Sequence, residues 1–106
     1  MVDVYTKQEV LDLTRKYVDY VRSQVDISGA YLFGSYAKDV AREESDIDVA
    51  FITKGITGNR FNDGLEFMKM RRDYDVRIEP HLFSPEDFGN NNWFANEVLE
   101  TGIRII

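Results

Sequence analysis

The chain has 106 residues, of which 43% are hydrophobic and 13% aromatic, and its formal net charge is −6. This length is enough to bury one core and too short for a second, so the sequence predicts a single domain over residues 1–106, while the absence of cysteine excludes disulfides and thiol nucleophiles. We expect a cytoplasmic protein without membrane association, because no long apolar span or leader is present. We also expect no binding to duplex nucleic acid, because affinity for its phosphates rests largely on Lys and Arg and the net charge of this chain is negative.

The first predicted element is a helix that begins after Thr6. Thr6 and Glu9 have the spacing of a capping box, in which the two side chains satisfy backbone amides of the first turn. Apolar residues then recur at helical spacing, which indicates a helix that ends near Gln24 and lays one face on the core. These residues are Val10, Leu11, Leu13, Tyr17, Val18, Val21 and Val25.

A first strand is predicted over residues 30–33, and it leads into Gly34 and Ser35. Glycine permits a close backbone approach at a turn, and we expect a short helix to begin after Ser35. The unpaired amides and the dipole of such a helix would favour an anion such as phosphate. The residues expected to face inward from this helix are Tyr36, Ala37, Val40 and Ala41.

Arg42 begins the charged segment that returns the chain to the next strand. It can steady an anionic site or a triphosphate, or it can form a solvated pair with Glu43 or Glu44. Ser45 ends the segment, and we expect its hydroxyl to bond to nearby backbone.

The second strand opens with two aspartates two residues apart. Because side chains alternate along a strand, Asp46 and Asp48 project from one face while Ile47, Val49 and Phe51 project from the other. Two carboxylates beside a phosphate site repel each other unless a hard cation lies between them. Mg²⁺ held by carboxylates and substrate phosphates fits this arrangement.

A polar loop over residues 53–59, either a lid or a simple connector, precedes a helix predicted from Arg60 to Asp73. Phe61, Leu65 and Met68 lie at i, i+4 and i+7, which indicates a buried stripe. The residues expected to widen this stripe are Phe67 and Met70.

The third strand is predicted over residues 75–83, with Pro80 indicating an edge position or a local break in the ladder. A carboxylate at Glu79 is costly in such a strand unless a charge compensates it, and Arg77 could do so as a structural ion pair. His81 is the only histidine, and we interpret it as a hydrogen-bonding residue at the strand end or as a substrate contact. Alternation places Val76, Ile78 and Leu82 on one side, with Arg77, Glu79 and His81 on the other.

The last quarter of the chain predicts two helix starts, one at Pro85 and one after the asparagines that end at Asn92. Gly102 should stop the final helix. The tail over residues 103–106 is too apolar to remain in water, so we expect it to pack on the core or on another chain, including a homo-oligomer. The predicted apolar stripe of the final helix is Trp93, Phe94, Val98 and Leu99.

The run GSYAKDVAREESDIDVAF resembles the nucleotidyltransferase superfamily typified by DNA polymerase beta, and most closely its minimal, antitoxin-type branch. The resemblance extends from about Tyr31 to Ile106. The chain departs from the usual pattern at Lys38-Asp39, where Arg-Gly is more typical. The resemblance implies an α+β fold with a three-stranded mixed sheet of order 1-2-3 and helices before, between and after the strands.

The resemblance also implies the site. Glu79 matches a third carboxylate on the strand beside the Asp-x-Asp strand, so Asp46, Asp48 and Glu79 are the implied catalytic residues and ligands of two Mg²⁺ ions. The implied nucleotide-binding residues are Gly34, Ser35, Lys38 and Arg42.

The function implied is transfer of AMP from ATP to a hydroxyl, with a tyrosine of a helical RNase-like toxin as the first choice of acceptor. One alternative is a small-molecule nucleotidyltransferase of the aminoglycoside-modifying kind. Another is an antitoxin that only binds its partner, although the presence of all three carboxylates argues against an inactive site.

Overall fold

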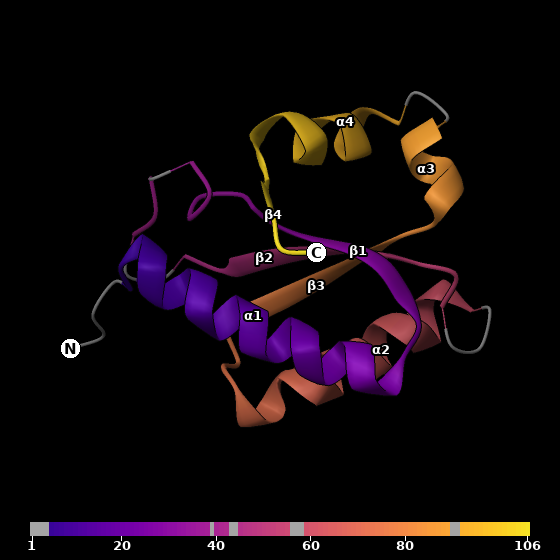
Figure 1. Cartoon of the computed structure of the whole chain (residues 1–106), viewed down its shortest axis with the longest axis horizontal. Coiled ribbons are helices and arrows are strands. Elements are labelled where there is room, and N and C mark those ends of the chain that lie inside the picture. Colours follow the sequence, from indigo (N-terminus) through magenta and orange to yellow (C-terminus); the bar gives the residue numbers. More distant parts are fainter. Residues whose placement is uncertain (1–4, 39, 43–44, 56–58, 90–91) are drawn as a thin grey trace.

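The computed structural model describes residues 5–38, 40–42, 45–55, 59–89 and 92–106 (Figure 1). The elements in chain order are α1 (Lys7–Gln24), β1 (Ile27–Phe33), β2 (Ile47–Thr53), α2 (Arg60–Met70), the 3-10 helix η1 (Arg71–Asp73), β3 (Ile78–Phe83), α3 (Pro85–Gly89), α4 (Trp93–Thr101) and β4 (Ile103–Arg104). Among the described residues, no helix is both long and apolar enough to cross a membrane.

The four strands form one mixed sheet in the order β3-β2-β1-β4. β1 is antiparallel to β2 and β4, whereas β2 and β3 are parallel. The expectation of a mixed α+β sheet is confirmed, but the expectation of three strands is wrong. The additional strand is β4, whose two residues pair with Tyr31 and Leu32. An element of two residues is too short to give an alternating sequence pattern, so only its burial could be predicted.

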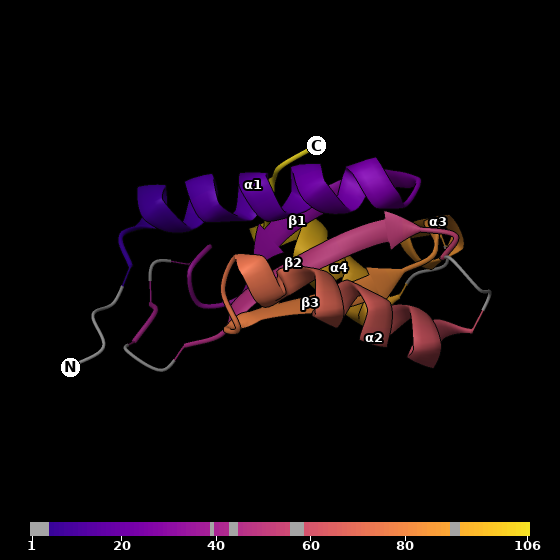
Figure 2. The same cartoon turned by 90° about the horizontal axis from the view of Figure 1, so that it is seen from below.

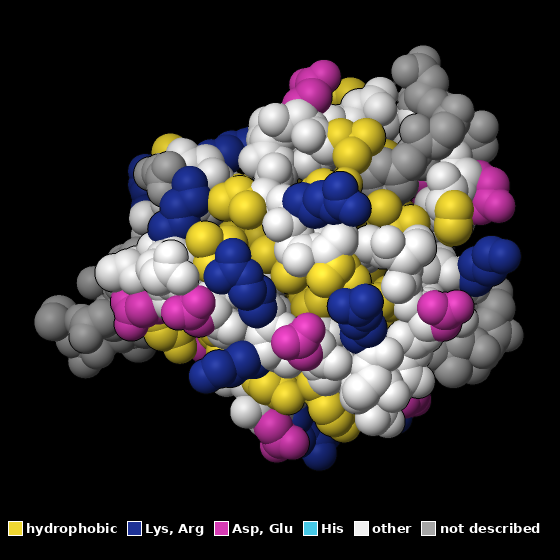
Figure 3. Space-filling model, viewed as in Figure 1, with side chains coloured by type: hydrophobic (Ala, Val, Ile, Leu, Met, Phe, Trp, Pro, Cys, Tyr) yellow, Lys and Arg dark blue, Asp and Glu magenta, His cyan; other side chains and the backbone are white. Residues whose placement is uncertain are grey.

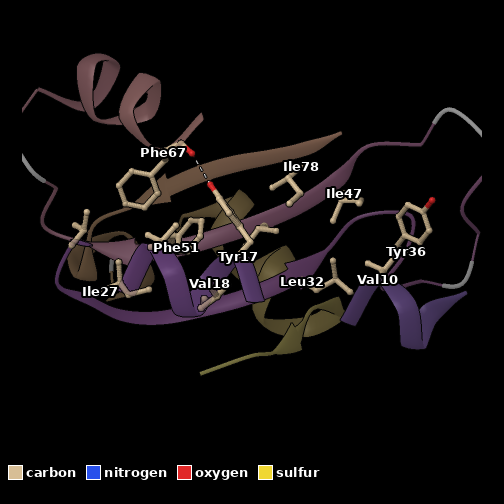
Figure 4. Close-up of a cluster of buried hydrophobic side chains, with 14 residues drawn as sticks. Val10, Tyr17, Val18, Ile27, Leu32, Tyr36, Ile47, Phe51, Phe67 and Ile78 are labelled. Atoms are coloured by element: carbon tan, nitrogen blue, oxygen red, sulfur yellow. Dashed lines mark hydrogen bonds between the residues drawn. The ribbon is translucent and has the colours of Figure 1, made fainter. Parts of the chain in front are cut away.

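Helices cover both faces of the sheet (Figures 1 and 2). α1 and α2 pack on one face, where Tyr17 of α1 and Phe67 of α2 meet Phe51 of β2. α4 packs on the other face through Ala95 and Val98, which are fully buried. The larger core therefore lies between β2 and the two helices α1 and α2, and Figure 4 shows its side chains.

The start of α1 confirms the predicted capping box. The amide of Glu9 donates to Thr6 Oγ1 at 3.1 Å, and the amide of Thr6 donates to Glu9 Oε1 at 2.9 Å. The helix buries the face that the sequence indicates, and it ends at Gln24 as expected.

The orientation of α2 differs from the prediction. Phe61, Leu65 and Met68 are 74%, 44% and 39% exposed, so the expected buried stripe faces outward. Phe67 is fully buried instead, because its ring packs against Phe51 at a centroid distance of 5.0 Å. Asp63, one turn earlier on the same face, is only 2% exposed.

Three other apolar residues, in two elements, are exposed although the sequence predicts that they face the core. Val76 is 71% exposed because β3 begins at Ile78 rather than at residue 75. In α4 the inward face is formed by Ala95 and Val98, which leaves Trp93 76% exposed. The same rotation of the helix leaves Leu99 46% exposed.

Charged groups of both signs are mixed on the face shown in Figure 3. Lys and Arg side chains there lie among Asp and Glu side chains and apolar atoms rather than in one stripe. The absence of duplex nucleic-acid binding stays a prediction.

Tyr17→Phe is expected to lower the free energy of unfolding by about 1–2 kcal/mol, because the Tyr17 hydroxyl donates to the buried carbonyl of Phe67 at 2.8 Å. Denaturant unfolding followed by circular dichroism measures this change. The matched control is Tyr20→Phe. Tyr20 is 39% exposed, so this substitution should change the free energy of unfolding by no more than about 0.5 kcal/mol. Equal effects of the two substitutions would contradict a specific role for the Tyr17 hydroxyl.

Candidate functional site

The pairing of β2 with β3 brings three polar side chains to one face of the sheet. Asp48 is paired with Glu79, and Ala50 is paired with His81, in parallel register. Because side chains alternate, Asp48, Glu79 and His81 lie on the face opposite the core residues Val49 and Phe51. One donor atom from each of Asp48, Glu79 and His81 lies within 4.8 Å of the other two.

His81 is held against Asp48. Its Nε2 lies 3.1 Å from Asp48 Oδ1, and because a carboxylate only accepts, Nε2 is the donor. The imidazole packs edge-on against Phe33 and Phe94, at centroid distances of 5.0 Å and 5.7 Å. The prediction that His81 lies on the same side as Glu79 is confirmed. Its hydrogen bond with Asp48 could not be predicted, because alternation along a strand does not give the register between two strands.

Glu79 lies among acidic neighbours. The pKa of its carboxyl is raised, first by desolvation and then by a hydrogen bond with Asp46, and the charges of Asp46 and Asp48 act in the same direction. The charge of His81 opposes these effects. Asp46 precedes the first residue of β2 and is exposed, and it is not among the three converging donors.

The alternative in which Arg77 neutralises Glu79 is wrong. Arg77 pairs with Asp75, with its Nη2 at 3.2 Å and its Nε at 3.3 Å from the carboxylate, and its guanidinium lies 4.3 Å from the centre of the Tyr5 ring. The Tyr5 hydroxyl donates to the same carboxylate at 2.6 Å. Arg77 precedes β3, so the alternation expected for it does not apply. Within the described part of the chain, no Lys or Arg side chain pairs with Glu79.

The turn after β1 packs directly on Asp48. Gly34 has φ +77°, and a Cβ built there would collide with Asp48 Oδ2 and lie 3.2 Å from Asp48 Cγ. A side chain at this position would therefore push against the acidic group. The sequence predicts a turn at which glycine permits a close approach, and the close neighbour in the structure is Asp48, while the phosphate role of the turn stays a prediction.

The helix expected after Ser35 is not present among the described residues: 35–38 form a turn, and 40–42 have no regular secondary structure. Lys38 N–H donates to Gly34 O at 3.1 Å, but Val40 N–H donates to Ser35 O at 3.0 Å, so the bonding shifts from i+4 to i+5 and no helical ladder propagates. Val40 is consequently 63% exposed instead of inward. The predicted helix dipole is therefore absent from this turn.

The cationic residues near the turn have different surroundings. Lys38 Nζ pairs with Glu97 Oε1 of α4 at 2.9 Å. Arg42 is exposed, and its amide donates to Ser45 Oγ at 2.7 Å, which confirms the predicted role of Ser45. The alternative pairing of Arg42 with Glu43 or Glu44 lies outside the described residues. The structure thus brings Gly34, Asp48 and Glu79 together and ties Lys38 to α4.

The donor set fits a divalent cation. Two carboxylates and an imidazole converge, and the described residues provide Glu79 with no Lys or Arg to balance its charge. Carboxylate oxygens are the ligands that Mg²⁺ prefers, and an imidazole is compatible with Mn²⁺ or other transition ions. The site can therefore hold a cation beside the Gly34 turn.

One family model and three solved structures match this chain. The family described as polymerase beta, nucleotidyltransferase, matches residues 15–106. A structure assigned as a nucleotidyltransferase from Sulfolobus solfataricus is 22% identical with a TM-score of 0.61, covering 98% of this chain and 89% of that one. A toxin–antitoxin structure with AMP-PNP is 16% identical with a TM-score of 0.59, covering 90% of this chain and 73% of that one. A mutant of the toxin–antitoxin pair MntA–HpeT is 15% identical with a TM-score of 0.50, covering 96% and 73% of the two chains. A search of curated proteins gives no match.

Gly34→Ala is expected to lower the free energy of unfolding by roughly 1–2 kcal/mol, because it places a Cβ at positive φ and against Asp48. The matched control is Gly64→Ala within α2, where the added Cβ meets nothing within 4 Å and should raise stability by roughly 0.5–1 kcal/mol. Denaturant unfolding of both variants measures the contrast. Stabilisation by Gly34→Ala would contradict the close packing of the turn on Asp48.

Glu79→Gln is expected to raise the thermal midpoint of the metal-free protein at pH 7. The folded-state pKa of Glu79 is raised, so the free energy of unfolding of the native protein falls as the pH rises from the ordinary value of 4.5 through the raised value. Glutamine resembles the protonated carboxyl, so the variant does not lose this stability as the pH rises. The difference in thermal midpoint between the variant and the native protein should therefore disappear below pH 4.5. Thermal unfolding across pH measures it.

The control for removing a negative charge is Glu100→Gln, because Glu100 is exposed. The thermal midpoint of this variant should follow that of the native protein across the pH range. A lower midpoint of Glu79→Gln at pH 7 would mean that the Glu79 charge is stabilised in the folded protein, contrary to the geometry.

Proposed function

The chain belongs to the polymerase beta nucleotidyltransferase family, and we propose that it transfers AMP from ATP to a tyrosine hydroxyl of a partner toxin protein. The observation that carries this proposal is the position of Asp48 and Glu79 side by side on β2 and β3, with Asp48 packed against Gly34. An acidic pair can hold a cation, and the adjacent backbone amides can receive the phosphates that such a cation binds.

In this proposal Asp46, Asp48 and Glu79 hold two Mg²⁺ ions, which when bound neutralise the charge on the attacking and leaving oxygens. His81 fixes the orientation of Asp48 through its hydrogen bond of 3.1 Å. Gly34 and Ser35 seat the β- and γ-phosphates at the turn. Arg42, exposed beside this segment, adds positive charge for the triphosphate.

The proposed reaction is an in-line displacement at the α-phosphorus. The acceptor oxygen forms a bond to phosphorus while the bond to the pyrophosphate oxygen breaks, and pyrophosphate leaves. The acceptor proton passes to one of the site carboxylates, which are positioned to act as a general base. The protein's contribution is to orient the two reactants and to stabilise the developing charge.

Lys38 has a conditional part in this scheme because it is already paired with Glu97 at 2.9 Å. A triphosphate at the Gly34 turn would compete with Glu97 for the Lys38 ammonium group. Since the pair is partly exposed, its loss costs little, and a phosphate can replace the carboxylate as partner.

A protein acceptor is favoured by the openness of the acidic face. Asp46 and Glu79 are exposed, so a tyrosine on the surface of another protein can reach them. The fold is similar to those of two toxin–antitoxin structures, and we propose a helical RNase-like toxin as the partner. The experiment is to incubate this chain with a purified toxin encoded beside it, ATP and Mg²⁺, and to measure AMP on the toxin by mass spectrometry together with pyrophosphate release.

Asp48→Asn is expected to reduce AMP transfer by a factor of roughly 10² or more, as for loss of other charge-stabilising groups. Its thermal midpoint without metal should be unchanged or higher, because asparagine retains an acceptor for His81 and removes one repelling charge. The matched control is Asp19→Asn on the exposed side of α1, which should transfer AMP at the native rate.

Removal of divalent cations with a chelator should abolish transfer by the native chain. Undiminished transfer by Asp48→Asn would contradict the assignment of this site. Neutralisation of the toxin by the native chain without any AMP transfer would instead favour the binding-only antitoxin.

A further inference from the structure

Trp93 is a large apolar side chain that the fold leaves in solvent. It is the only tryptophan of the chain and is 76% exposed. It lies at the first residue of α4, where the Asn92 side chain caps the helix by accepting from the amide of Ala95 at 3.0 Å. Its ring contacts Phe94 with a centroid distance of 6.2 Å and a tilt of 41°, so one face of the indole is available.

A series of ring contacts connects this indole to the acidic site. Phe94 packs against Phe33 at 5.5 Å and against His81 at 5.7 Å, and His81 bonds to Asp48. Trp93 is therefore separated from the imidazole beside the site by one intervening ring. Because Phe94 also packs against Phe83 at 5.4 Å, the start of α4 is fixed on the sheet.

The side of α4 that carries Trp93 also contacts the Gly34 turn. Residues four apart in a helix are neighbours on its surface, so Trp93 and Glu97 lie one turn apart on the same side. Glu97 in turn binds Lys38, which closes the Gly34 turn through its amide. The exposed indole, the Gly34 turn and the acidic pair are thus connected through α4, the turn by Glu97 and the acidic pair by Phe94.

We propose that the Trp93 indole is the stacking platform for the base of the nucleotide whose phosphates lie at the Gly34 turn. This inference rests on the proposed function and adds the element that binds the base. Aromatic stacking is available to every base and grows with the area of the ring system, so the site should prefer purine over pyrimidine nucleoside triphosphates. The indole offers only one N–H donor, so it contributes little to the distinction between adenine and guanine.

The test uses the fluorescence of the single tryptophan. Titration with ATP and Mg²⁺ should quench it, whereas inorganic tripolyphosphate with Mg²⁺, which has no base, should bind by calorimetry without comparable quenching. Trp93→Leu, which keeps an apolar side chain but loses the ring, should weaken ATP binding by roughly 5- to 100-fold. Its affinity for tripolyphosphate should be unchanged.

Trp93→Phe should retain most of the ATP affinity, because phenylalanine still stacks. Leu99→Ala is the matched control, since Leu99 is 46% exposed on the same helix, and it should change neither affinity. The thermal midpoint of each variant verifies that it is folded.

Three results would overturn the inference. Equal ATP affinity of the native chain and Trp93→Leu would remove the stacking role while leaving the phosphate site intact. Equal quenching by ATP and tripolyphosphate would mean that the indole reports a change at the turn rather than contact with a base. Failure of both ligands to bind the native chain would reject the proposed function together with this inference.

Discussion

The parallel register of β2 and β3 is the constraint on which the site depends. It sets Asp48 beside Glu79, and a shift of β3 by one residue relative to β2 would turn Glu79 toward the core and separate the two carboxylates. The carboxylates repel each other, so the metal-free fold maintains an unfavourable arrangement that other contacts must offset. The opposite face of β2 supplies those contacts, since Val49 and Phe51 are fully buried beneath α1 and α2.

The surroundings of Asp48 show how one side chain can be fixed by two direct neighbours and by the groups that hold them. Gly34 approaches it closely from the end of β1, His81 bonds to it from β3, and the rings of Phe33 and Phe94 hold that imidazole. These contacts come from β1 and its following turn, from β3 and from α4, so the orientation of Asp48 depends on several elements. Preorganisation of this kind lets charged groups act without rearranging at the moment of reaction.

Much of this arrangement could be predicted because it depends on local patterns. The Thr6 capping box and the alternation around Asp48 require no knowledge of distant residues. The turn at Gly34 could be predicted because glycine readily adopts the positive φ found there. The orientation of α2 could not be predicted, since Phe61 belongs to a regular apolar stripe and only the contact of Phe67 with Phe51 selects the other face. The partners of Arg77 and His81 were equally inaccessible, because each depends on where a strand begins and how it is paired.

The pairing of β4 affects the order in which the sheet can be completed during synthesis. Ala30 of β1 exchanges backbone hydrogen bonds with Ile105 and Ile106, and β4 covers the adjacent part of the same strand. Until residues 103–106 leave the ribosome, this edge of β1 presents unpaired amides and carbonyls beside apolar side chains, which is a template for pairing with other nascent chains. The residues translated last in this sheet are thus the ones that protect the strand leading into the Gly34 turn from aggregation.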